Sequence, residues 1–392
     1  MKEVFIVSMA RTPIGALCGT LASVNVIELG KTVVQAAMER AGINGDQIDE
    51  VYLGNVLQAN VGQAPAQQVS IAAGINTKTP CTTINKVCAS GMKAIMLGAQ
   101  SIMLGDNNIV VVGGMESMSN APHYLPSGRN GIKYGNGEIL DAISRDGLQD
   151  PYKKYMMGNA GEVCARHYSF TREDQDAYAI TSYKRAQDAY ANNYFKDEIV
   201  PVTIRSRKGD ITIAEDEEYK KFDESKVSAL KPAFEKEGTI TAINASKIND
   251  GASAMVLMSG EKVKELGVQP LAKILSFADA SQEPEWFTTT PSKAIPKALA
   301  KANVDISNVD FFEINEAFSV VALANIKELN ITHEQTNVFG GAVALGHPIG
   351  NSGCRIVGTL ISVLKYKNGK IGAAGICNGG GGASAIVIEK CA

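Results

Sequence analysis

Two stretches of the chain share one pattern and decide its fold. Residues 85–113 read NKVCASGMKAIMLGAQSIMLGDNNIVVVG, and residues 347–375 read HPIGNSGCRIVGTLISVLKYKNGKIGAAG. In both, a helix-like run that begins at Ser-Gly is followed by a polar turn and then by a short strand-like run. Ser352 follows Ser90 by 262 residues (352 − 90), and Gly375 follows Gly113 by the same number (375 − 113). This constant offset indicates an internal duplication.

The duplication extends upstream of both stretches. The strand-like run at residues 48–55 corresponds to 308–315, and the run at 4–8 corresponds to 272–276. These runs are rich in Val and Ile, as strands buried on both faces are, and helix-like segments alternate with them. We therefore expect an α/β fold with two copies of a strand-and-helix unit and a mainly parallel sheet in each half. Residues 252–258 are expected to form a last strand of the first half.

A different composition separates the halves. Residues 196–237 carry 20 charged side chains in 42, against 20% for the whole chain, which is typical of a solvated surface. Thr171 and Asp174 are spaced as a capping box and predict a helix over 172–190. We expect an inserted domain at 119–244, an N-terminal half at 1–118 plus 245–268, and a C-terminal half at 269–392.

Composition excludes several classes of protein. The chain has 392 residues, 45% of them hydrophobic, and a net charge of −3, which gives no reason to expect nucleic acid or an anionic membrane as partner. No apolar run is expected to reach the roughly 18–20 residues that are needed to span a bilayer. Seven scattered cysteines without metal-ligand spacing indicate free thiols and no metal site. Because the N-terminus enters a strand-like run directly, we expect a cytoplasmic protein.

Two clusters lie on equivalent loops of the duplicated unit. Cys88 precedes a helix, whose N-terminal N–H groups and partial positive charge stabilise a thiolate. The alternative is a structural cysteine beside a capping serine. His347 lies in a glycine-rich loop at the position that corresponds to Asn85, so it precedes the equivalent helix in the other half. The two loops can face one another. A phosphate-binding loop is the alternative for the second cluster, but the lysine of a P-loop is missing.

Two further clusters follow strand-like runs. Cys377 comes just past a strand, where reactive groups gather in such sheets, and the glycines after it leave N–H groups free to bind an oxyanion. A purely structural glycine turn is the alternative. Asn315 ends another strand-like run, where its side chain either holds a water or an amide, or caps the next helix.

Seven motifs together resemble the thiolase family over essentially the whole chain, most closely its biosynthetic acetyl-CoA acetyltransferases. Any one motif is weak, but their order along the chain is specific. They are Cys88-Ala-Ser-Gly91, Gly113-Gly-Met-Glu-Ser-Met-Ser119, Gly238-Thr-Ile-Thr-Ala242, Asn249-Asp-Gly-Ala252, Asn315-Glu-Ala-Phe318, and the loops around His347 and Cys377.

The resemblance implies a fold and an activity. The fold is a duplicated βαβαβ core that forms a layered αβαβα sandwich. A loop domain that binds coenzyme A is inserted in this core. The activity is Claisen condensation of two acetyl-CoA to acetoacetyl-CoA and CoA, and the reverse thiolysis, in fatty acid metabolism. The resemblance also implies a homotetramer built as a dimer of dimers. Coenzyme A thioesters are substrates, and no cofactor is expected to be bound permanently.

The resemblance also implies roles for six residues. Cys88 is the nucleophile that takes the acyl group, and His347 raises its nucleophilicity and helps bind the thioester oxygen. Cys377 removes the α-proton of the second acetyl-CoA. Asn315 fixes a water that completes one oxyanion hole with His347, the N–H groups of Cys88 and Gly379 form the other, and Ser246 lies near the pantetheine arm.

Several positions depart from the family's common pattern. Met156 stands where a histidine is frequent, Asn159 replaces a common alanine, and Phe287 replaces a Met-Gly turn near the acyl pocket. Lys247 stands where a small residue is typical, and Asn378 replaces an aliphatic residue. These differences bear on acyl-chain length and branching.

Three other activities are compatible with the resemblance. A degradative 3-ketoacyl-CoA thiolase would act on longer chains. A non-catalytic carrier of acyl-CoA or lipid could lose one of the four reactive side chains, whereas this chain keeps all of them. A decarboxylating condensing enzyme would normally carry histidine in place of Cys377.

Overall fold

The computed structural model describes residues 1–207 and 209–391 of the chain. The elements of the N-terminal half are β1 (Val4–Arg11), β2 (Gly15–Ala16), α1 (Val26–Ala41), β3 (Glu50–Gly54), α2 (Pro65–Ala72), β4 (Cys81–Ile84), α3 (Ser90–Leu104), β5 (Ile109–Ser117), β10 (Asn249–Ser259) and α6 (Gly260–Leu266). Those of the C-terminal half are β11 (Ala272–Ser281), α7 (Pro291–Ala302), β12 (Phe311–Ile314), α8 (Ser319–Leu329), α9 (Ala342–Leu345), α10 (Ile349–Tyr366), β13 (Ile371–Asn378) and β14 (Gly382–Lys390). Between β5 and β10 lie β6 (His123–Tyr124), β7 (Leu140–Asp141), α4 (Met157–Tyr168), α5 (Arg172–Ala191), β8 (Val202–Ile204) and β9 (Ile211–Ile213).

The strands of the two halves pair in equivalent ways, as the duplication predicts. The strands follow the path β12-β13-β14-β11-β1-β10-β5-β3-β4, and β2 pairs with β10. In the N-terminal half β5 is parallel to β3 and antiparallel to β10; in the C-terminal half β13 is parallel to β12 and antiparallel to β14. The halves join where β1 pairs antiparallel with β11, through Phe5 opposite Lys273 and Ile6 opposite Ala272.

The expectation of a mainly parallel sheet in each half needs one correction, because one strand in each half runs against the others. Strand β14 is antiparallel to both of its neighbours, and so is its counterpart β10. The physical reason is visible between β13 and β14, which are joined by a three-residue turn in which Gly380 and Gly381 adopt positive φ. A turn this short can only connect antiparallel strands, since a parallel pair needs a long crossover.

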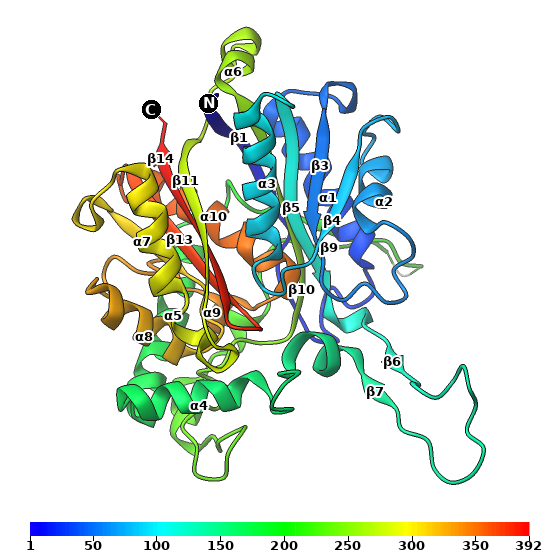
Figure 1. Ribbon diagram of the computed structural model, residues 1–392, viewed down its shortest axis with the longest axis vertical. Coiled ribbons are helices and arrows are strands. Elements are labelled where there is room, and N and C mark those ends of the chain that lie inside the picture. Colours follow the sequence, from blue (N-terminus) through cyan, green and yellow to red (C-terminus); the bar gives the residue numbers. More distant parts are fainter. Residues whose placement is uncertain (208, 392) are drawn as a thin grey trace.

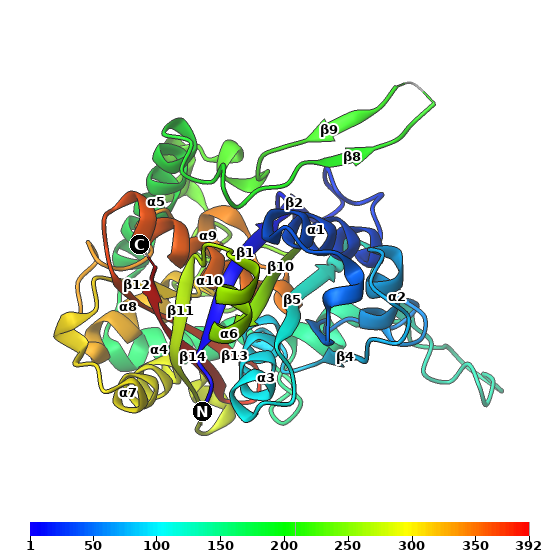
Figure 2. The ribbon, with the colours of Figure 1, turned by 90° about the horizontal axis from the view of Figure 1, so that it is seen from above.

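The helices and sheets form the five layers expected of an αβαβα sandwich. Helices α1 and α2 cover one outer face and α7 lies on the opposite outer side (Figures 1 and 2). Between the sheets, Ile95 of α3 and Ile356 of α10 share one buried cluster with Val110 of β5 and Ile376 of β13. The core is therefore divided by the sheets, and the central helices contact both halves.

Glycines allow the two central helices to touch at their first turns. A Cβ atom added to Gly91 of α3 would lie 2.8 Å from the backbone nitrogen of Cys354, and one added to Gly353 of α10 would lie 2.5 Å from that of Met92. Only glycine fits at such a close approach of backbones. The two positions are equivalent in the duplication, so the two helices meet at corresponding points of the two halves.

One segment contradicts the expectation that no apolar run reaches membrane-spanning length. By length and composition alone Val87–Leu104 is long and apolar enough to cross a bilayer. This segment is essentially α3, which lies between the two sheets with Ile95 and Ile102 fully buried. A helix covered on nearly all sides by a protein core needs apolar residues all round, and this explains its composition.

The inserted segment lies along one side of the core. Helix α5 begins after Thr171, whose hydroxyl accepts from the N–H of Asp174 in the predicted capping box. Helices α4 and α5 pack against α8, and α5 also contacts α9. Two arms project from the body, one ending in the β8–β9 hairpin and one joining β6 to β7 (Figures 1 and 2). The β6–β7 arm exposes the apolar side chains of Leu125, Ile132, Tyr134 and Ile139.

Candidate active site

The loop before α3 presents Cys88 through a strained backbone. Val87 has φ of +48°, a left-handed conformation that is costly for a β-branched residue and that is found mostly at functional sites. The hydroxyl of Ser90 fixes this loop, because it accepts from the N–H of Lys86 at 2.8 Å and donates to the carbonyl of Val87 at 2.6 Å. Cys88 is partly exposed, whereas His347 and Cys377 are buried.

Desolvation works against a thiolate at Cys88. Burial raises the pKa of the Cys88 thiol to about 12, although the N–H groups of Gly379 and of Cys88 itself point to the sulfur and oppose the shift. The donors expected at the helix terminus are present and favour the thiolate, but desolvation of the charged sulfur outweighs them. A base must accept the proton when the sulfur reacts.

His347 is a neutral imidazole with one free ring nitrogen. Its backbone N–H donates to Oδ1 of Asn249 at 2.9 Å, and its Nδ1 lies 2.6 Å from Oγ of Ser352. The Ser352 hydroxyl lies 3.0 Å from the carbonyl of Pro348 and can donate its single hydrogen there, from which we infer that Nδ1 carries the ring hydrogen and donates to Ser352. Nε2 keeps its lone pair and has no protein partner among residues 1–207 and 209–391. Burial, with the nearby charge of Arg355, lowers the pKa of His347 to about 3.

Cys377 and Gly379 bring the C-terminal half to Cys88. Cys377 lies near the end of β13, opposite Ala383 of β14. Burial raises the pKa of the Cys377 thiol above its usual value, and a charge on Cys88 raises it further, so the two sulfurs are close enough to interact. A Cβ atom added to Gly379 would lie 3.7 Å from both Val87 Cγ1 and Met157 Sδ. The nucleophile loop, the glycine turn and the inserted segment therefore meet here.

Asn315 offers two unused polar atoms. It follows β12, and its backbone N–H donates to the carbonyl of Gly375 at 3.0 Å. Its side-chain Oδ1 and Nδ2 are buried and make no hydrogen bond within the described part of the chain. Phe318, not Asn315, occupies the N-cap of α8, so the helix-cap alternative is wrong. Buried polar atoms without partners are rare, which indicates that this amide binds water or substrate.

Segment 244–249 connects these loops. The N–H of Ser246 donates to the carbonyl of Ala317 at 3.0 Å, and the N–H of Ser319 donates to the carbonyl of Asn244 at 2.8 Å. At its other end Asn249 holds the backbone of His347. Ser246 is partly exposed, beside the Asn315 loop.

Sequence reasoning missed the roles of Ser352 and Asn249. The signal in the sequence that points to Ser352 is its 262-residue offset from Ser90. In both halves this serine hydroxyl bonds back to a backbone carbonyl of the preceding loop. Asn249 lies in one of the seven motifs, but its contact with His347 depends on the fold.

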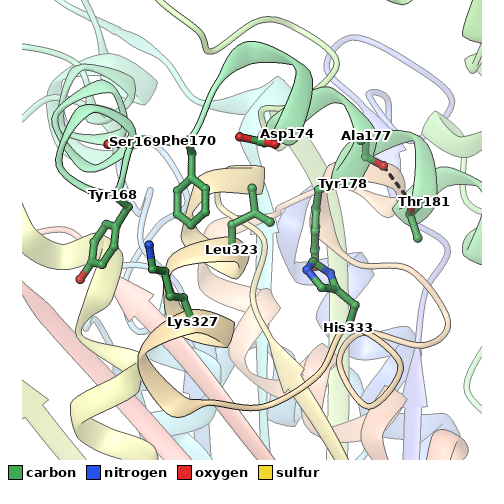
Figure 3. Close-up of a pocket in the computed structure, with 10 residues that line it drawn as sticks. All are labelled: Tyr168, Ser169, Phe170, Asp174, Ala177, Tyr178, Thr181, Leu323, Lys327 and His333. Carbon is green, nitrogen blue, oxygen red and sulfur yellow. Dashed lines mark hydrogen bonds between the residues drawn. The ribbon is translucent and has the colours of Figure 1, made fainter.

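A surface hollow of about 490 Å³ lies apart from these residues, beside α4, α5 and α8 (Figure 3). Its lining includes Lys327, whose Nζ lies 5.6 Å from the ring centroids of both Tyr168 and Phe170. His333 faces Tyr178 there, with ring centroids 5.7 Å apart. The hollow is lined by none of the predicted site residues.

Comparisons with known proteins agree with the fold and the motifs. The family described as "Thiolase, N-terminal domain" matches residues 4–261, and "Thiolase, C-terminal domain" matches residues 268–390. An acetyl-CoA acetyltransferase of Schizosaccharomyces pombe is 55% identical over 99% of each chain. "Acetyl-CoA acetyltransferase ERG10, cytosolic" of Gibberella zeae is 55% identical over 100% of this chain and 99% of its own length.

Solved structures give the same result. The crystal structure of the Acat5 thiolase from Ascaris suum in complex with coenzyme A covers all of both chains, with 49% identity and a TM-score of 0.95. The acetyl-CoA acetyltransferase of Bacillus anthracis has 41% identity and a TM-score of 0.97 over 100% of this chain and 99% of its own. The duplicated layered fold and these relatives define an acyltransferase enzyme. The chain belongs to the thiolase family.

Proposed function

We propose that this protein is an acetyl-CoA C-acetyltransferase that condenses two acetyl-CoA to acetoacetyl-CoA and CoA, and catalyses the reverse thiolysis, through an acyl-cysteine at Cys88. The observation that carries the proposal is the environment of the Cys88 sulfur. The N–H of Gly379 in the opposite half points to this sulfur, and a Cβ atom added to Gly379 would lie 3.7 Å from Val87 Cγ1 beside it. A charge on Cys88 also raises the pKa of a second thiol, that of Cys377. Relatives that span the same length are named acetyl-CoA acetyltransferases.

The first half-reaction transfers an acetyl group to Cys88. The free Nε2 of His347 accepts the proton of the Cys88 thiol while the sulfur attacks the thioester carbonyl carbon. The N–H groups of Cys88 and Gly379 bind the oxyanion that develops. The carbon–sulfur bond to CoA breaks, and the leaving thiolate takes the proton of Cys377. Cys88 is then acetylated, His347 is an imidazolium and Cys377 is a thiolate.

The second half-reaction uses the base that the first one produced. The Cys377 thiolate removes an α-proton from a second acetyl-CoA, and its raised pKa makes it a strong base. The enolate oxygen is bound by protonated His347 and by a water held on the unpaired amide of Asn315. The enolate carbon attacks the carbonyl carbon of acetyl-Cys88, and the Cys88 sulfur leaves. The sulfur recovers its proton from His347, so that Cys88, His347 and Cys377 return to their starting states.

The substrate range follows from the apolar surroundings of Cys377. Phe287 is buried and packs in the same cluster as Cys377 and Phe318. We expect this ring to occupy space that a longer acyl chain would need, and therefore propose short-chain substrates over the longer chains of a degradative 3-ketoacyl-CoA thiolase. A turnover series from C4 to C12 3-ketoacyl-CoAs, with Phe287→Ala beside the unaltered protein, tests this; an unaltered protein that prefers C8 or longer would exclude it.

The remaining proposals concern the substrate, domains, assembly and location. Ser246 would lie beside the pantetheine arm of bound CoA. Residues 119–244 would form the coenzyme A-binding domain. The N-terminal half would consist of residues 1–118 plus 245–268, and the C-terminal half of residues 269–392. We propose a homotetramer, a dimer of dimers, and the exposed apolar side chains of the β6–β7 arm support contact with another copy. A cytoplasmic location is supported by the relative named cytosolic. No permanently bound cofactor is proposed.

Labelled acetyl-CoA provides the decisive experiment. The protein is incubated with the label, quenched with acid and digested, and the labelled peptide is identified by mass spectrometry, while condensation is followed by the appearance of acetoacetyl-CoA. We expect the label on Cys88. Cys88→Ser should lower condensation by roughly three orders of magnitude, because a serine hydroxyl is a far weaker nucleophile at neutral pH. Label on any other residue, or a Cys88→Ser variant of near-normal activity, would overturn the proposal.

A further inference from the structure

Lys86 joins the loop that carries Cys88 to the C-terminal half. Its Nζ donates to the Ser384 hydroxyl at 2.9 Å and, more weakly, to the carbonyl of Ala383 at 3.4 Å, both on β14. The same ammonium pairs with the carboxylate of Asp279 on β11. Strands β11 and β14 lie side by side (Figure 1), and their register places Asp279 directly opposite Ser384. We call Lys86, Asp279 and Ser384 the Lys86 clamp.

The Lys86 clamp is a charged network that crosses the two halves. The Ser384 hydroxyl accepts from Lys86 and donates to Oδ1 of Asp279 at 2.7 Å. Burial opposes the ionisation of Asp279, but hydrogen bonds from Lys86, Lys93 and Ser384 outweigh it and lower the pKa of this carboxyl to about 2. The carboxylate therefore stays charged throughout the neutral range. A fully exposed ion pair contributes little, but these side chains are only 25% (Lys86) and 37% (Asp279) exposed and share a third partner.

The clamp lies next to both sulfurs of the proposed site. Lys86 is two residues before Cys88, and Ala383, whose carbonyl it contacts, is paired with Cys377 across β13 and β14. Apart from the Cys88 sulfur, no other side chain of residues 85–89 hydrogen-bonds to the C-terminal half within the described part of the chain. Lys86 is therefore the side chain that fixes this loop against the β13–β14 hairpin.

The position of this loop sets the spacing of two hydrogen-bond donors. The N–H groups of Cys88 and Gly379 come from opposite halves and both point to the Cys88 sulfur. Val87, between Lys86 and Cys88, has φ of +48°, and such a conformation persists only where the surroundings hold it. A loop released from β14 would relax and carry the N–H of Cys88 away from that of Gly379.

We propose that Lys86 is a positioning residue that holds the Cys88 loop against β14 and so sets the spacing between the N–H groups of Cys88 and Gly379. This role rests on the proposed function, in which these two groups form an oxyanion hole. Lys86 does not touch the reacting atoms, because it acts through the backbone of residues 87 and 88. Loss of the clamp should therefore slow the attack of Cys88 on a thioester while the protein remains folded.

The test compares Lys86→Met with Lys93→Met. Both lysines bond to Asp279 and both side chains are 25% exposed, so the two variants remove the same charge from the same carboxylate. Lys93, however, lies in α3, which is held between the sheets by fully buried side chains such as Ile95. We expect Lys86→Met to slow the acetylation of Cys88 by labelled acetyl-CoA roughly tenfold to a hundredfold. Lys93→Met should match the unaltered protein.

Alkylation of Cys88 follows the loop without acyl transfer. The N–H of Gly379 opposes the rise in the pKa of the Cys88 thiol, so a loop that moves away from it should hold less thiolate at a given pH. Iodoacetamide should therefore modify Cys88 in Lys86→Met roughly threefold or more slowly than in the unaltered protein, with the modified peptide quantified by mass spectrometry. Thermal unfolding midpoints show that each variant is folded. Equal rates of acetylation and alkylation in the two lysine variants would overturn the proposal.

Asp279→Asn breaks the same clamp from the C-terminal half, and it replaces Lys86→Met in the test if that variant does not fold. Its acetylation defect should resemble that of Lys86→Met. The double variant should be no slower than the slower single variant, because both changes remove one contact. Defects that multiply in the double variant would show that the two residues act independently, which contradicts a clamp. Failure of the unaltered protein to acetylate Cys88 would instead count against the proposed function.

Discussion

Replacement of Ser352 by alanine tests the hydrogen bond that sets the proton on His347. The Ser352 hydroxyl lies 2.6 Å from Nδ1 of His347 and is fully buried. Without the hydroxyl, the Nδ1 hydrogen has no acceptor, and the imidazole is free to move that hydrogen to Nε2. In this second tautomer His347 cannot accept the proton of Cys88.

The size of the effect follows from the change of charge during the reaction. In the resting protein the hydrogen bond between Ser352 and His347 joins neutral groups and is worth about 0.5–1.5 kcal/mol. Once His347 is an imidazolium, the same hydrogen bond is charge-assisted and worth about 1.5–3 kcal/mol. The difference of about 1–1.5 kcal/mol is available only when Cys88 has transferred its proton, so its loss should lower kcat roughly tenfold. The unsatisfied buried donor should also cost about 1–3 kcal/mol of folding stability.

Helix α10 provides a matched control at Ser362. Its Oγ is buried and has no hydrogen-bond partner in the described part of the chain, so Ser362→Ala makes the same chemical change without removing a bond. The assay is kcat and KM for condensation, together with the burst rate of Cys88 acylation and the free energy of unfolding in urea. Ser362→Ala should match the unaltered protein. If Ser352→Ala is destabilised but keeps kcat within about twofold, the hydrogen bond is structural only and the reasoning about the tautomer is refuted.

Three further predictions concern the reacting groups. Cys377→Ala should still become acetylated at Cys88 from labelled acetyl-CoA but form no acetoacetyl-CoA; a variant that cannot self-acetylate shows that the two cysteines divide the work differently. Asn315→Ala should lose roughly a hundredfold or more in kcat, yet its unfolding free energy should not fall, because neither polar atom of that side chain has a protein partner within the described residues; a clear loss of stability would mean that the amide is structural. Because burial raises the pKa of Cys88 to about 12 and lowers that of His347 to about 3, the thiolate fraction should grow with pH, and alkylation of Cys88 by iodoacetamide should accelerate continuously from about pH 6 to about pH 9. A rate that is already constant across this range would reveal a preformed thiolate–imidazolium pair.

The direction of the last strand in each half could not be read from the sequence. Apolar runs and alternating helices predict strands and crossovers but do not show which neighbour a strand will choose. Strand β10 follows an insertion of more than a hundred residues and still pairs with β1 and β5, because the apolar faces of α1 and α3 have to be covered. Likewise, the apolar composition of α3 did not show that this helix lies between the two sheets, where it is the most deeply enclosed helix of the N-terminal half.

The sequence by itself determined the duplication and the family, and it named the side chains that we propose to react. The 262-residue offset placed His347 on the loop equivalent to that of Cys88, and the glycines at 91 and 353 were visible as part of the same pattern. These features are local or periodic, and local chemistry is what a sequence records directly.

Only the tertiary structure decided how those side chains are protonated and held. Desolvation raises the pKa of the Cys88 thiol, and His347 has a free Nε2 because Ser352 engages its other nitrogen. The ammonium of Lys86 reaches Ser384, 298 residues further along the chain. Desolvation and hydrogen-bond geometry depend on neighbours that folding brings from distant parts of the chain, so no pattern along the sequence could have specified them.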